Sequence, residues 1–226
     1  MAVVPPPRQP PPSPGGRGRS APEEDDVTET RRPAPRSGEA RDRLYNAAVE
    51  AFSRKGFHGT TTRDIAAAAG MSPAALYVHH RSKEDILYRI SRRGHETMLA
   101  VLRSARASSA DHVERLRAVV RDVVSYHARA HVLARVVNDE LAALAPEHRT
   151  EVEALRHAVD AEMQGVVQDG VADGAFHCED PRVAAAALLS LAVDVARWYR
   201  EDGAWTPEEL GEHYAHLAVR IVGAGR

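Results

Sequence analysis

Residues 41–87 read RDRLYNAAVEAFSRKGFHGTTTRDIAAAAGMSPAALYVHHRSKEDIL and carry the strongest structural signals in this chain. Their apolar side chains recur at spacings of three and four, which is typical of amphipathic helices. Stop and start signals interrupt the pattern: Gly56 and Gly70 follow apolar runs, and Ser72 with Pro73 opens a new one. The stretch therefore predicts several short helices separated by tight turns.

The expected helices of this region cover residues 38–55, 61–70 and 72–79, and a fourth begins at residue 82. Thr61 and Asp64 have the spacing of a capping box, with Asp in place of the usual Glu. The turn AGMS joins the second helix to the third. Two helices joined by a short turn that contains glycine form the helix-turn-helix pattern, which is only moderately specific by itself.

The rest of the chain shows the same helical periodicity and lacks the alternation that is typical of a sheet. Further helices are expected at residues 111–129, 131–144, 147–173, 181–201 and 206–222. Asp180 before Pro181, and Thr206 before Pro207, mark the last two starts. The predicted fold class is all-α, with a three-helix helix-turn-helix domain over residues 38–98 and a helical domain over residues 99–226.

The first 37 residues differ in composition from the rest. Ten of the 14 prolines lie among the first 36 residues, and few apolar residues accompany them. Such a segment cannot bury a core, so we expect a disordered tail over residues 1–37. The lone cysteine, Cys178, indicates a reducing, cytoplasmic location. The longest apolar-rich run, residues 183–193, is far shorter than the roughly 20 residues that a membrane span needs.

Charge is distributed unevenly along the chain. Residues 41–90 carry eight basic and five acidic side chains, whereas residues 91–226 carry 16 basic and 21 acidic ones. An excess of three charges is within chance, but its coincidence with the helix-turn-helix pattern favours one end that faces nucleic acid.

Residues 41–87 resemble the N-terminal domain of TetR-family transcriptional regulators without a gap. The resemblance lies in the core of the first helix up to Phe52, GF at 56–57, TTRDIA at 61–66, AG at 69–70, LYxH at 76–79 and SKE at 82–84. It implies an all-helical homodimer whose N-terminal domains bind a palindromic operator and whose C-terminal helices bind a small molecule and dimerise. One departure is His80, which stands where the family usually has phenylalanine. This leaves open whether His80 is a core residue or faces phosphate.

The resemblance places the helix-turn-helix motif over residues 61–80, with the start of the helix at residue 72 in the major groove. Small side chains there give little bidentate base readout, while Arg63 is long enough to reach a phosphate or a base. Tyr77, His79 and Lys83 match the backbone-clamping positions, although Tyr77 and His79 also suit helix packing. The expected DNA-binding residues are Thr61, Thr62, Arg63, Ser72, Pro73, Ala74, Ala75, Tyr77, His79, His80 and Lys83.

The last two predicted helices suit a dimer interface. The helix from Pro181 is apolar nearly all round, and the last helix has apolar residues at heptad-like spacing. Two such helices from each chain would form a four-helix bundle; the alternative is a monomeric core. The expected interface residues are Leu188, Leu191, Leu210, Tyr214, Leu217 and Ile221.

Residues 197–214, RWYREDGAWTPEELGEHY, are more weakly similar to a TetR subgroup that represses lipid or steroid catabolism and is released by acyl-CoA thioesters. A guanidinium pairs with phosphate and an indole stacks on adenine, which would suit such a ligand. The alternative is a helix end that packs on the dimer core. The candidate ligand residues are Tyr126, Asn138, Glu140, Met163, Arg197, Trp198 and Tyr199.

Two other function classes were weighed. His127 and His131 have the i, i+4 spacing of a metal-ligand pair, so a metal-responsive regulator is an alternative, although 12 histidines make such a pair common by chance. No nucleophile elbow, HExxH, P-loop or GxGxxG is present, which argues against an enzyme. The favoured function is a cofactor-free repressor that binds double-stranded operator DNA as a homodimer and is released by a small molecule.

Overall fold

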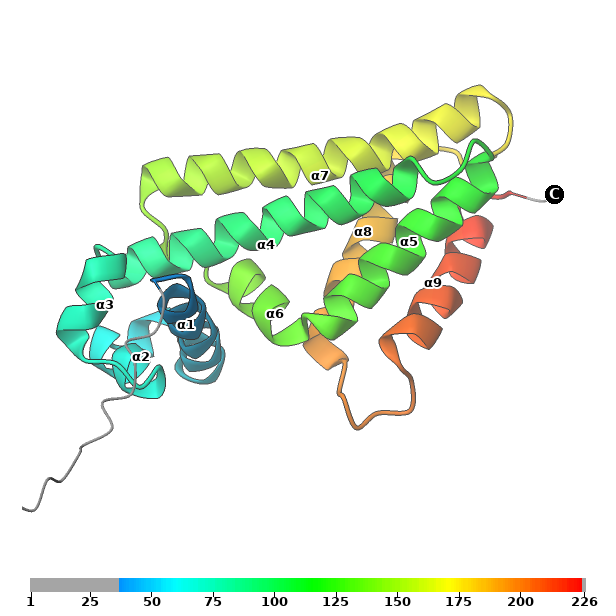
Figure 1. The fold of residues 1–226 in the computed structure, drawn as a ribbon. Helices are drawn as coiled ribbons and strands as arrows, with labels where there is room; N and C mark the ends of the chain where they lie inside the picture. Colours follow the sequence, from blue (N-terminus) through cyan, green and yellow to red (C-terminus); the bar gives the residue numbers. More distant parts are fainter. Residues whose placement is uncertain (1–36, 225–226) are drawn as a thin grey trace, which may run out of the picture. The chain divides into compact units, whose positions relative to one another are not determined.

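The computed structural model describes residues 37–224, which lie within one compact unit. Every regular element in these residues is a helix, so the all-α prediction is confirmed for them (Figure 1). The elements are α1 (Ser37–Gly59), α2 (Thr62–Ala68), α3 (Pro73–His79), α4 (Lys83–Arg106), α5 (His112–Arg129), α6 (His131–Asp139), the 3-10 helix η1 (Leu141–Ala143), α7 (Pro146–Ala172), α8 (Pro181–Trp198) and α9 (Pro207–Ile221). The predicted disordered tail lies outside the described residues, except for Ser37.

Helices begin where the capping signals lie in the sequence. The Thr61 hydroxyl accepts a hydrogen bond from the Asp64 N–H, and the Asp64 carboxylate accepts one from the Thr61 N–H. Thr206 and Glu209 form the same reciprocal pair at the start of α9. These bonds satisfy N–H groups that have no partner within the helix, so local sequence is sufficient to place each start.

The first helix breaks at Gly56, as predicted. Gly56 has a φ of 69°, and a further turn runs on to Gly59. This left-handed backbone is accessible to glycine and costly for other residues. The break turns the chain toward α2.

Two helices end earlier than predicted. α6 stops at Asp139 instead of residue 144, and Leu144 has an extended backbone that buries its side chain in the N-terminal core. α8 stops at Trp198 instead of residue 201, and Tyr199 then leaves the helical conformation with its side chain buried. In both cases, burial of an apolar side chain beyond the helix end overrides the helical tendency of the local sequence.

The long helix α4 runs from the N-terminal helices into the C-terminal ones, and α7 lies alongside it (Figure 1). Two hydrophobic cores lie along this axis. The first contains Phe52, Ile65, Leu76 and Leu87, and the second is built by α4, α5, α7, α8 and α9. None of the helices in residues 37–224 is long and apolar enough to cross a membrane.

The first core is not built from the N-terminal helices alone. Val136 and Val137 of α6, Leu144 after η1 and Val152 of α7 also belong to it. The division at residue 98 therefore stays a prediction: it falls inside α4, and residues beyond it complete the packing of the helix-turn-helix region.

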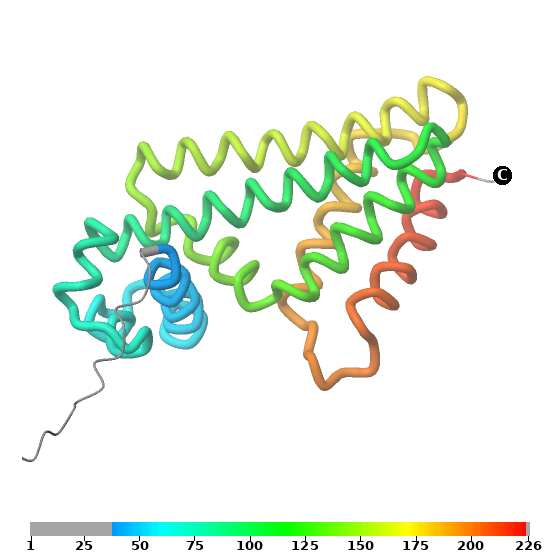
Figure 2. The backbone as a smooth tube through the Cα atoms, in the orientation of Figure 1, coloured from blue at the N-terminus to red at the C-terminus, as the bar shows by residue number. Residues whose placement is uncertain are grey.

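The C-terminal helix α9 returns along α5 after the loop that follows α8 (Figure 2). Gly211 is buried at this contact, and a Cβ added there would lie 2.7 Å from the Arg121 carbonyl oxygen and within contact of the Ser125 hydroxyl. Ser125 also donates to the Pro207 carbonyl, 2.9 Å away. The close approach of these two helices therefore depends on glycine.

We expect Gly211→Ala to destabilise the fold. In a helix, alanine is favoured over glycine by about 0.8–1.0 kcal/mol. Overpacking against a main-chain carbonyl costs about 1–3 kcal/mol, so we expect a net decrease in the free energy of unfolding. Thermal or denaturant unfolding measures the change. Gly165→Ala in α7 is the matched control, because the added Cβ meets only the flexible end of Arg106. Equal stability of the two variants would contradict the prediction.

Candidate DNA-binding and ligand-binding sites

The recognition helix α3 exposes one side and buries the other. Leu76 is fully buried in the first core and fixes the helix, while Ser72, Pro73 and Ala74 are exposed at its start. Further along, the side chains of Tyr77 and Val78 are 54% and 79% exposed. The exposed side therefore presents small side chains first and a phenol and an isopropyl group one turn later.

Val78 is absent from the sequence prediction. It lies four residues after Ala74, so helical periodicity places it on the same exposed side. A large apolar side chain with this exposure suits contact with a thymine methyl or a sugar. Its position in a helix-turn-helix was the available signal.

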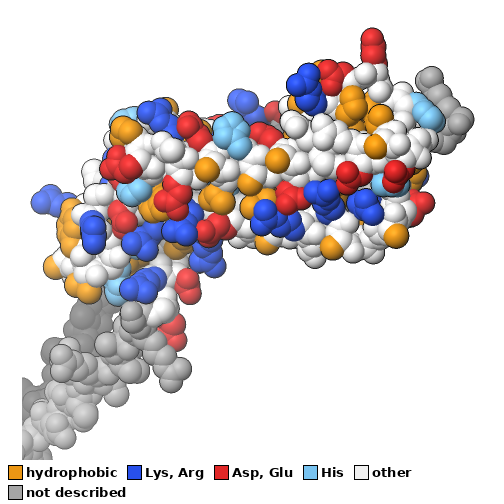
Figure 3. Space-filling model, turned by 90° about the horizontal axis from the view of Figure 1, so that it is seen from above, with side chains coloured by type: hydrophobic (Ala, Val, Ile, Leu, Met, Phe, Trp, Pro, Cys, Tyr) orange, Lys and Arg blue, Asp and Glu red, His pale blue; other side chains and the backbone are white. Residues whose placement is uncertain are grey.

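The start of α2 adjoins the same surface. Thr62 and Tyr77 share a hydrogen bond of 3.2 Å between their hydroxyl oxygens, which links α2 to α3. Arg63 is exposed and makes no ion pair with any described residue. Thr61 is exposed too, but its hydroxyl serves the capping box. Ala75 and His79 are half-buried. Seen from above, basic and acidic side chains are interspersed over the N-terminal helices, as they are along the rest of this face (Figure 3).

His80 belongs to the interior, which corrects its placement among the DNA-binding residues. Its side chain is 8% exposed, and Nδ1 lies 3.1 Å from an Asp85 carboxylate oxygen. Burial lowers the pKa of His80 despite this carboxylate. Burial opposes ionisation of Asp85, but hydrogen bonds from Arg89 and His80 outweigh it and lower the pKa of Asp85. A neutral imidazole thus fills the place of the usual phenylalanine by donating to a carboxylate in the first turn of α4.

Lys83 holds the end of α1. Its Nζ donates to the Phe57 carbonyl at 2.6 Å and to the Thr60 carbonyl at 2.8 Å, and it lies 4.1 Å from the centre of the Phe57 ring. An ammonium group has three donors, so only one remains for a phosphate. The structure thus gives Lys83 a structural role that the sequence reasoning missed.

Two adjacent cavities lie in the C-terminal half. The outer cavity, of about 480 Å³, is lined by α6, α7 and α8, and the inner cavity, of about 90 Å³, reaches α4 and α5. Asn138, Arg156, Asp160, Leu189 and Val193 line both cavities, so the two lie next to each other.

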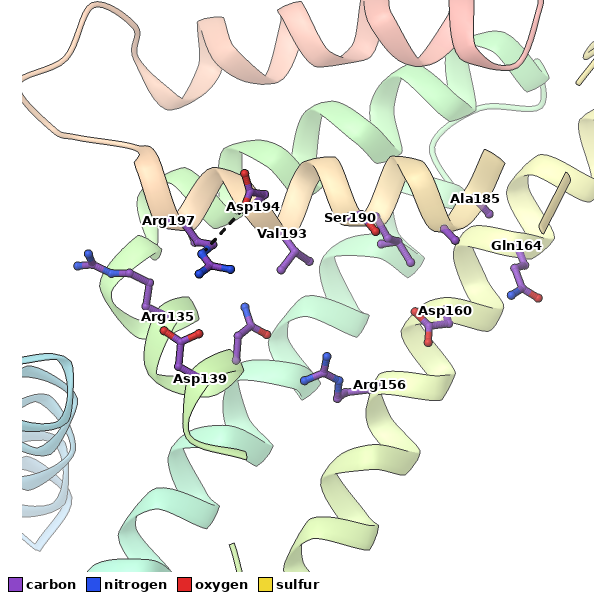
Figure 4. Close-up of a pocket in the computed structure, with 14 residues that line it drawn as sticks. Arg135, Asp139, Arg156, Asp160, Gln164, Ala185, Ser190, Val193, Asp194 and Arg197 are labelled. Atoms are coloured by element: carbon purple, nitrogen blue, oxygen red, sulfur yellow. Dashed lines mark ion pairs between the residues drawn. The ribbon is translucent and has the colours of Figure 1, made fainter. Parts of the chain in front are cut away.

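The outer cavity is polar and the inner one is largely apolar. Arg135, Arg156 and Arg197 line the outer cavity with Asp139, Asp160 and Asp194 (Figure 4). Arg197 lies 4.0 Å from Asp194, an ion pair marked in Figure 4, whereas Arg156 pairs with no acidic side chain of the described residues. Met98, Val137 and Leu189 line the inner cavity. A ligand with an anionic part and an apolar part would match this division.

The TetR family accounts for both surfaces. A family model described as "Bacterial regulatory proteins, tetR family" matches residues 44–90, and one described as "Tetracyclin repressor-like, C-terminal domain" matches residues 109–222. The transcriptional repressor KstR2 of Rhodococcus jostii is 31% identical over 183 residues, which cover 79% of this chain and 89% of that protein. The chain belongs to the TetR family. It is a DNA-binding transcriptional regulator and not an enzyme.

Solved TetR-family structures agree with this assignment. A regulatory protein from Rhodococcus RHA1 has a TM-score of 0.78 and 37% identity, covering 83% of this chain and 98% of that one. AibR, solved in complex with isovaleryl coenzyme A and operator DNA, has a TM-score of 0.70 and 24% identity, covering 82% of this chain and 99% of that one. The second likeness concerns the fold alone.

Three of the seven candidate ligand residues of this TetR-family regulator line the cavities. Asn138 lines both, Tyr126 lines the inner one and Arg197 lines the outer one. The Tyr126 hydroxyl donates to the Gly94 carbonyl at 3.3 Å, and burial raises the pKa of Tyr126 to about 12.

The other four candidates lie elsewhere. Glu140 accepts a hydrogen bond of 2.9 Å from the Phe57 N–H, so its carboxylate faces the first core. Met163 is fully buried in the second core, where Tyr199 is also buried. Trp198 is exposed at the end of α8, outside the cavity linings. Helical periodicity could not distinguish these residues from those that line the cavities, because a polar or aromatic residue on a helix can face either a cavity or a neighbouring helix.

Sequence reasoning also missed two cavity residues, Arg156 and Asp160. They lie four residues apart on α7, so they share one side of that helix. Their spacing was visible in the sequence, but i, i+4 charge pairs are more often solvent-exposed. Only the packing of α6 and α8 beside them reveals a cavity.

The alternative metal site gains no support from the surroundings of its two histidines. Nδ1 of His127 and Nδ1 of His131 are each bound to a main-chain carbonyl oxygen, at 2.9 and 3.0 Å. Residues 37–224 contain no group of three His, Cys, Asp or Glu side chains that could hold a metal ion. The i, i+4 spacing therefore reflects helix packing.

An apolar surface runs along α8 and α9. Its large exposed side chains are Val183, Leu191, Trp198, Leu217 and Ile221. Tyr214 is half-buried, whereas Leu188 and Leu210 are buried in the second core. The last two were predicted at the dimer interface, and the structure corrects this: both helices have apolar residues on two sides, and these two side chains face the protein's own core.

Replacing Lys83 with alanine should lower the free energy of unfolding by about 1.5–3 kcal/mol, because two charge-assisted hydrogen bonds to main-chain oxygens are lost. Lys55→Ala is the matched control, since Lys55 is exposed and makes a single ion pair with Asp64 at 3.6 Å. Denaturant unfolding measures both variants. If Lys83→Ala is no less stable than Lys55→Ala, the structural role of Lys83 is wrong.

Proposed function

We propose that this TetR-family regulator is a repressor that binds a palindromic operator as a homodimer and is released by an acyl-CoA thioester. The observation that carries the proposal is the pair of adjacent cavities, of which the outer is polar and lined by arginines and the inner is largely apolar. The relative KstR2 is named a transcriptional repressor, which supports repression over activation.

Operator recognition would use the exposed surface of α2 and α3. Pro73, Ala74 and Val78 offer apolar contacts to base edges, while Arg63 and Tyr77 suit the DNA backbone. Small apolar side chains at the major groove give modest direct readout. Specificity would then depend on two half-sites held at fixed spacing by a dimer.

Dimerisation would bury the apolar surface of α8 and α9. Val183, Leu191 and Trp198 of α8 and Leu217 and Ile221 of α9 are large apolar side chains exposed to solvent, and clusters of such side chains mark interaction surfaces. A two-fold axis next to both helices would join them with their copies into a four-helix bundle.

Leu217→Glu should dissociate this dimer. A carboxylate buried without a partner costs several kcal/mol, and every ~1.4 kcal/mol is tenfold in the dissociation constant. Sedimentation equilibrium measures the oligomeric state. His216→Glu is the matched control, because it adds the same charge to an exposed neighbouring position of α9. If the Leu217→Glu protein remains dimeric, the dimer interface must lie on another surface.

The effector would place its anionic nucleotide part against the arginines and its acyl part in the inner cavity. Guanidinium groups bind phosphates through paired charge-assisted hydrogen bonds, and Arg156 is available for this. AibR, which shares this fold, was solved with isovaleryl coenzyme A and operator DNA together. The fold therefore accommodates both kinds of ligand.

A mechanical route from the cavity to the DNA-binding surface passes through α6. Asn138 and Asp139 line the cavity, and Glu140, the next residue, binds the Phe57 N–H. A ligand that shifts the end of α6 would therefore disturb the end of α1. The shift in operator affinity is limited by the ratio of the ligand's affinities for the two arrangements.

Titrating acyl-CoA thioesters into a preformed operator complex tests the proposal. Typical coupling of about 1–3 kcal/mol would weaken operator binding roughly 5- to 150-fold. Arg156→Ala should raise the thioester concentration needed for release by about 10-fold or more, because a charge-assisted hydrogen bond is lost, and should leave ligand-free operator affinity unchanged.

Arg103→Ala is the matched control for Arg156→Ala, since Arg103 is exposed on α4 and pairs with Glu162 outside the cavities. Free CoA and divalent metals are the ligand controls. Release by no thioester would reject the acyl-CoA class, and a response of Arg156→Ala equal to that of the original protein would reject the assigned phosphate site.

A further inference from the structure

Two buried histidines line the inner cavity. His95 comes from α4 and His127 from α5, and their side chains are 8% and 5% exposed. Each imidazole is held by its own helix: Nδ1 lies 2.8 Å from the Ser91 carbonyl oxygen in His95 and 2.9 Å from the Val123 carbonyl oxygen in His127. A carbonyl oxygen only accepts, so each Nδ1 carries a proton.

Both rings are neutral. Burial lowers the pKa of His95, and the nearby Arg156 charge lowers it further. Burial also lowers the pKa of His127, as does the proximity of His95. A neutral imidazole that carries its proton on Nδ1 has an unprotonated Nε2, which can only accept a hydrogen bond.

Neither Nε2 atom receives a hydrogen bond from any described residue. Nε2 lies across the ring from Nδ1, so it points away from the helix to which Nδ1 is bound. The one hydroxyl group nearby in the lining, that of Tyr126, donates to the Gly94 carbonyl at 3.3 Å. Asn138, Arg156 and Asp160 also line this cavity, but no described side chain donates a hydrogen bond to either Nε2 atom, so the cavity contains two hydrogen-bond acceptors without a donor.

We propose that the inner cavity selects an acyl group that carries a hydroxyl, which donates its hydrogen bond to Nε2 of His95 or His127. The proposal rests on the proposed function, because it concerns the acyl part of the same effector. A plain hydrocarbon chain would exclude water from both Nε2 atoms without offering either a hydrogen bond. A keto oxygen could not offer one either, because it is itself only an acceptor. A hydroxyl group on the chain can donate the hydrogen bond that an Nε2 atom lacks.

Cavity size places the hydroxyl on a short acyl group. The inner cavity has about 90 Å³ and the outer one about 480 Å³. Only a few non-hydrogen atoms fit in the inner cavity, so the thioester and the nucleotide stay in the outer one. The hydroxyl then lies close to the end of the chain that enters.

Calorimetric titration of the full chain without DNA tests this selectivity. The ligands are butyryl-CoA, 3-hydroxybutyryl-CoA and 4-hydroxybutyryl-CoA, which differ only in the hydroxyl. At least one hydroxyacyl thioester should bind about 10-fold or more tightly than butyryl-CoA, because a site built for a donor rejects a ligand that lacks one. At least one of the variants His95→Phe and His127→Phe should lose that preference.

His131→Phe is the matched control, since His131 has the same Nδ1 bond to a main-chain carbonyl but does not line the inner cavity. It should keep the preference. If the phenylalanine variants fail to fold, nitrogen NMR of the histidine rings in the original protein gives the answer. The chemical shift of at least one Nε2 should then change when a hydroxyacyl thioester is added and remain unchanged when butyryl-CoA is added.

The outcomes separate the two proposals. Binding of none of the three thioesters would overturn the acyl-CoA effector and this inference with it. Equal or weaker binding of the hydroxyacyl thioesters would overturn the inference alone, as would a preference that persists in both phenylalanine variants.

Discussion

The end of α1 is held by two charged side chains from distant parts of the chain, and the DNA-binding surface depends on this clamp. The left-handed Gly56 interrupts the helix and leaves main-chain groups without helical partners. Glu140 of α6 accepts from the Phe57 N–H, while Lys83 of α4 donates to the Phe57 and Thr60 carbonyls. A Cβ at Gly56 would also lie 3.2 Å from a Glu140 carboxylate oxygen, so a larger residue there would have to displace this contact. The direction in which the chain enters α2 follows from these contacts.

The same clamp ties the helix-turn-helix to the cavities. Glu140 ends the helix whose preceding residues line the outer cavity, so one short helix contacts both regions. Val136 and Val137 of α6 are buried in the first core, and Val137 also lines the inner cavity. Because a packed core adjusts in discrete steps and not continuously, a displacement of α6 by a ligand would be transmitted to α1. This is the physical basis for the proposed response to an effector.

Much of the fold was accessible from local sequence. Thr61 with Asp64, Ser72 with Pro73, and Thr206 with Glu209 lie where the structure places helix starts, and Gly56 marks the predicted break. The family motif also predicted that Arg63, Tyr77 and the start of α3 belong to one surface, and all of them are exposed in the structure. The errors have a common origin. His80, Glu140, Leu188 and Leu210 were assigned to a surface or a cavity from the family pattern or from their type and spacing. In the structure, His80 is buried against Asp85 of the next helix, Glu140 binds the Phe57 N–H, and both leucines lie in the second core.

Capping bonds, helix breaks and the helix-turn-helix motif involve residues a few positions apart, so the sequence alone determines them. The cavities are different in kind. Arg156 on α7, His95 on α4 and His127 on α5 become neighbours only when three helices pack together. Helical periodicity states which side of a helix a residue occupies, but not which helix that side meets. The tertiary structure therefore decided which polar residues line a cavity, which serve the core and which stay exposed, because those roles depend on contacts between segments that are far apart in the chain.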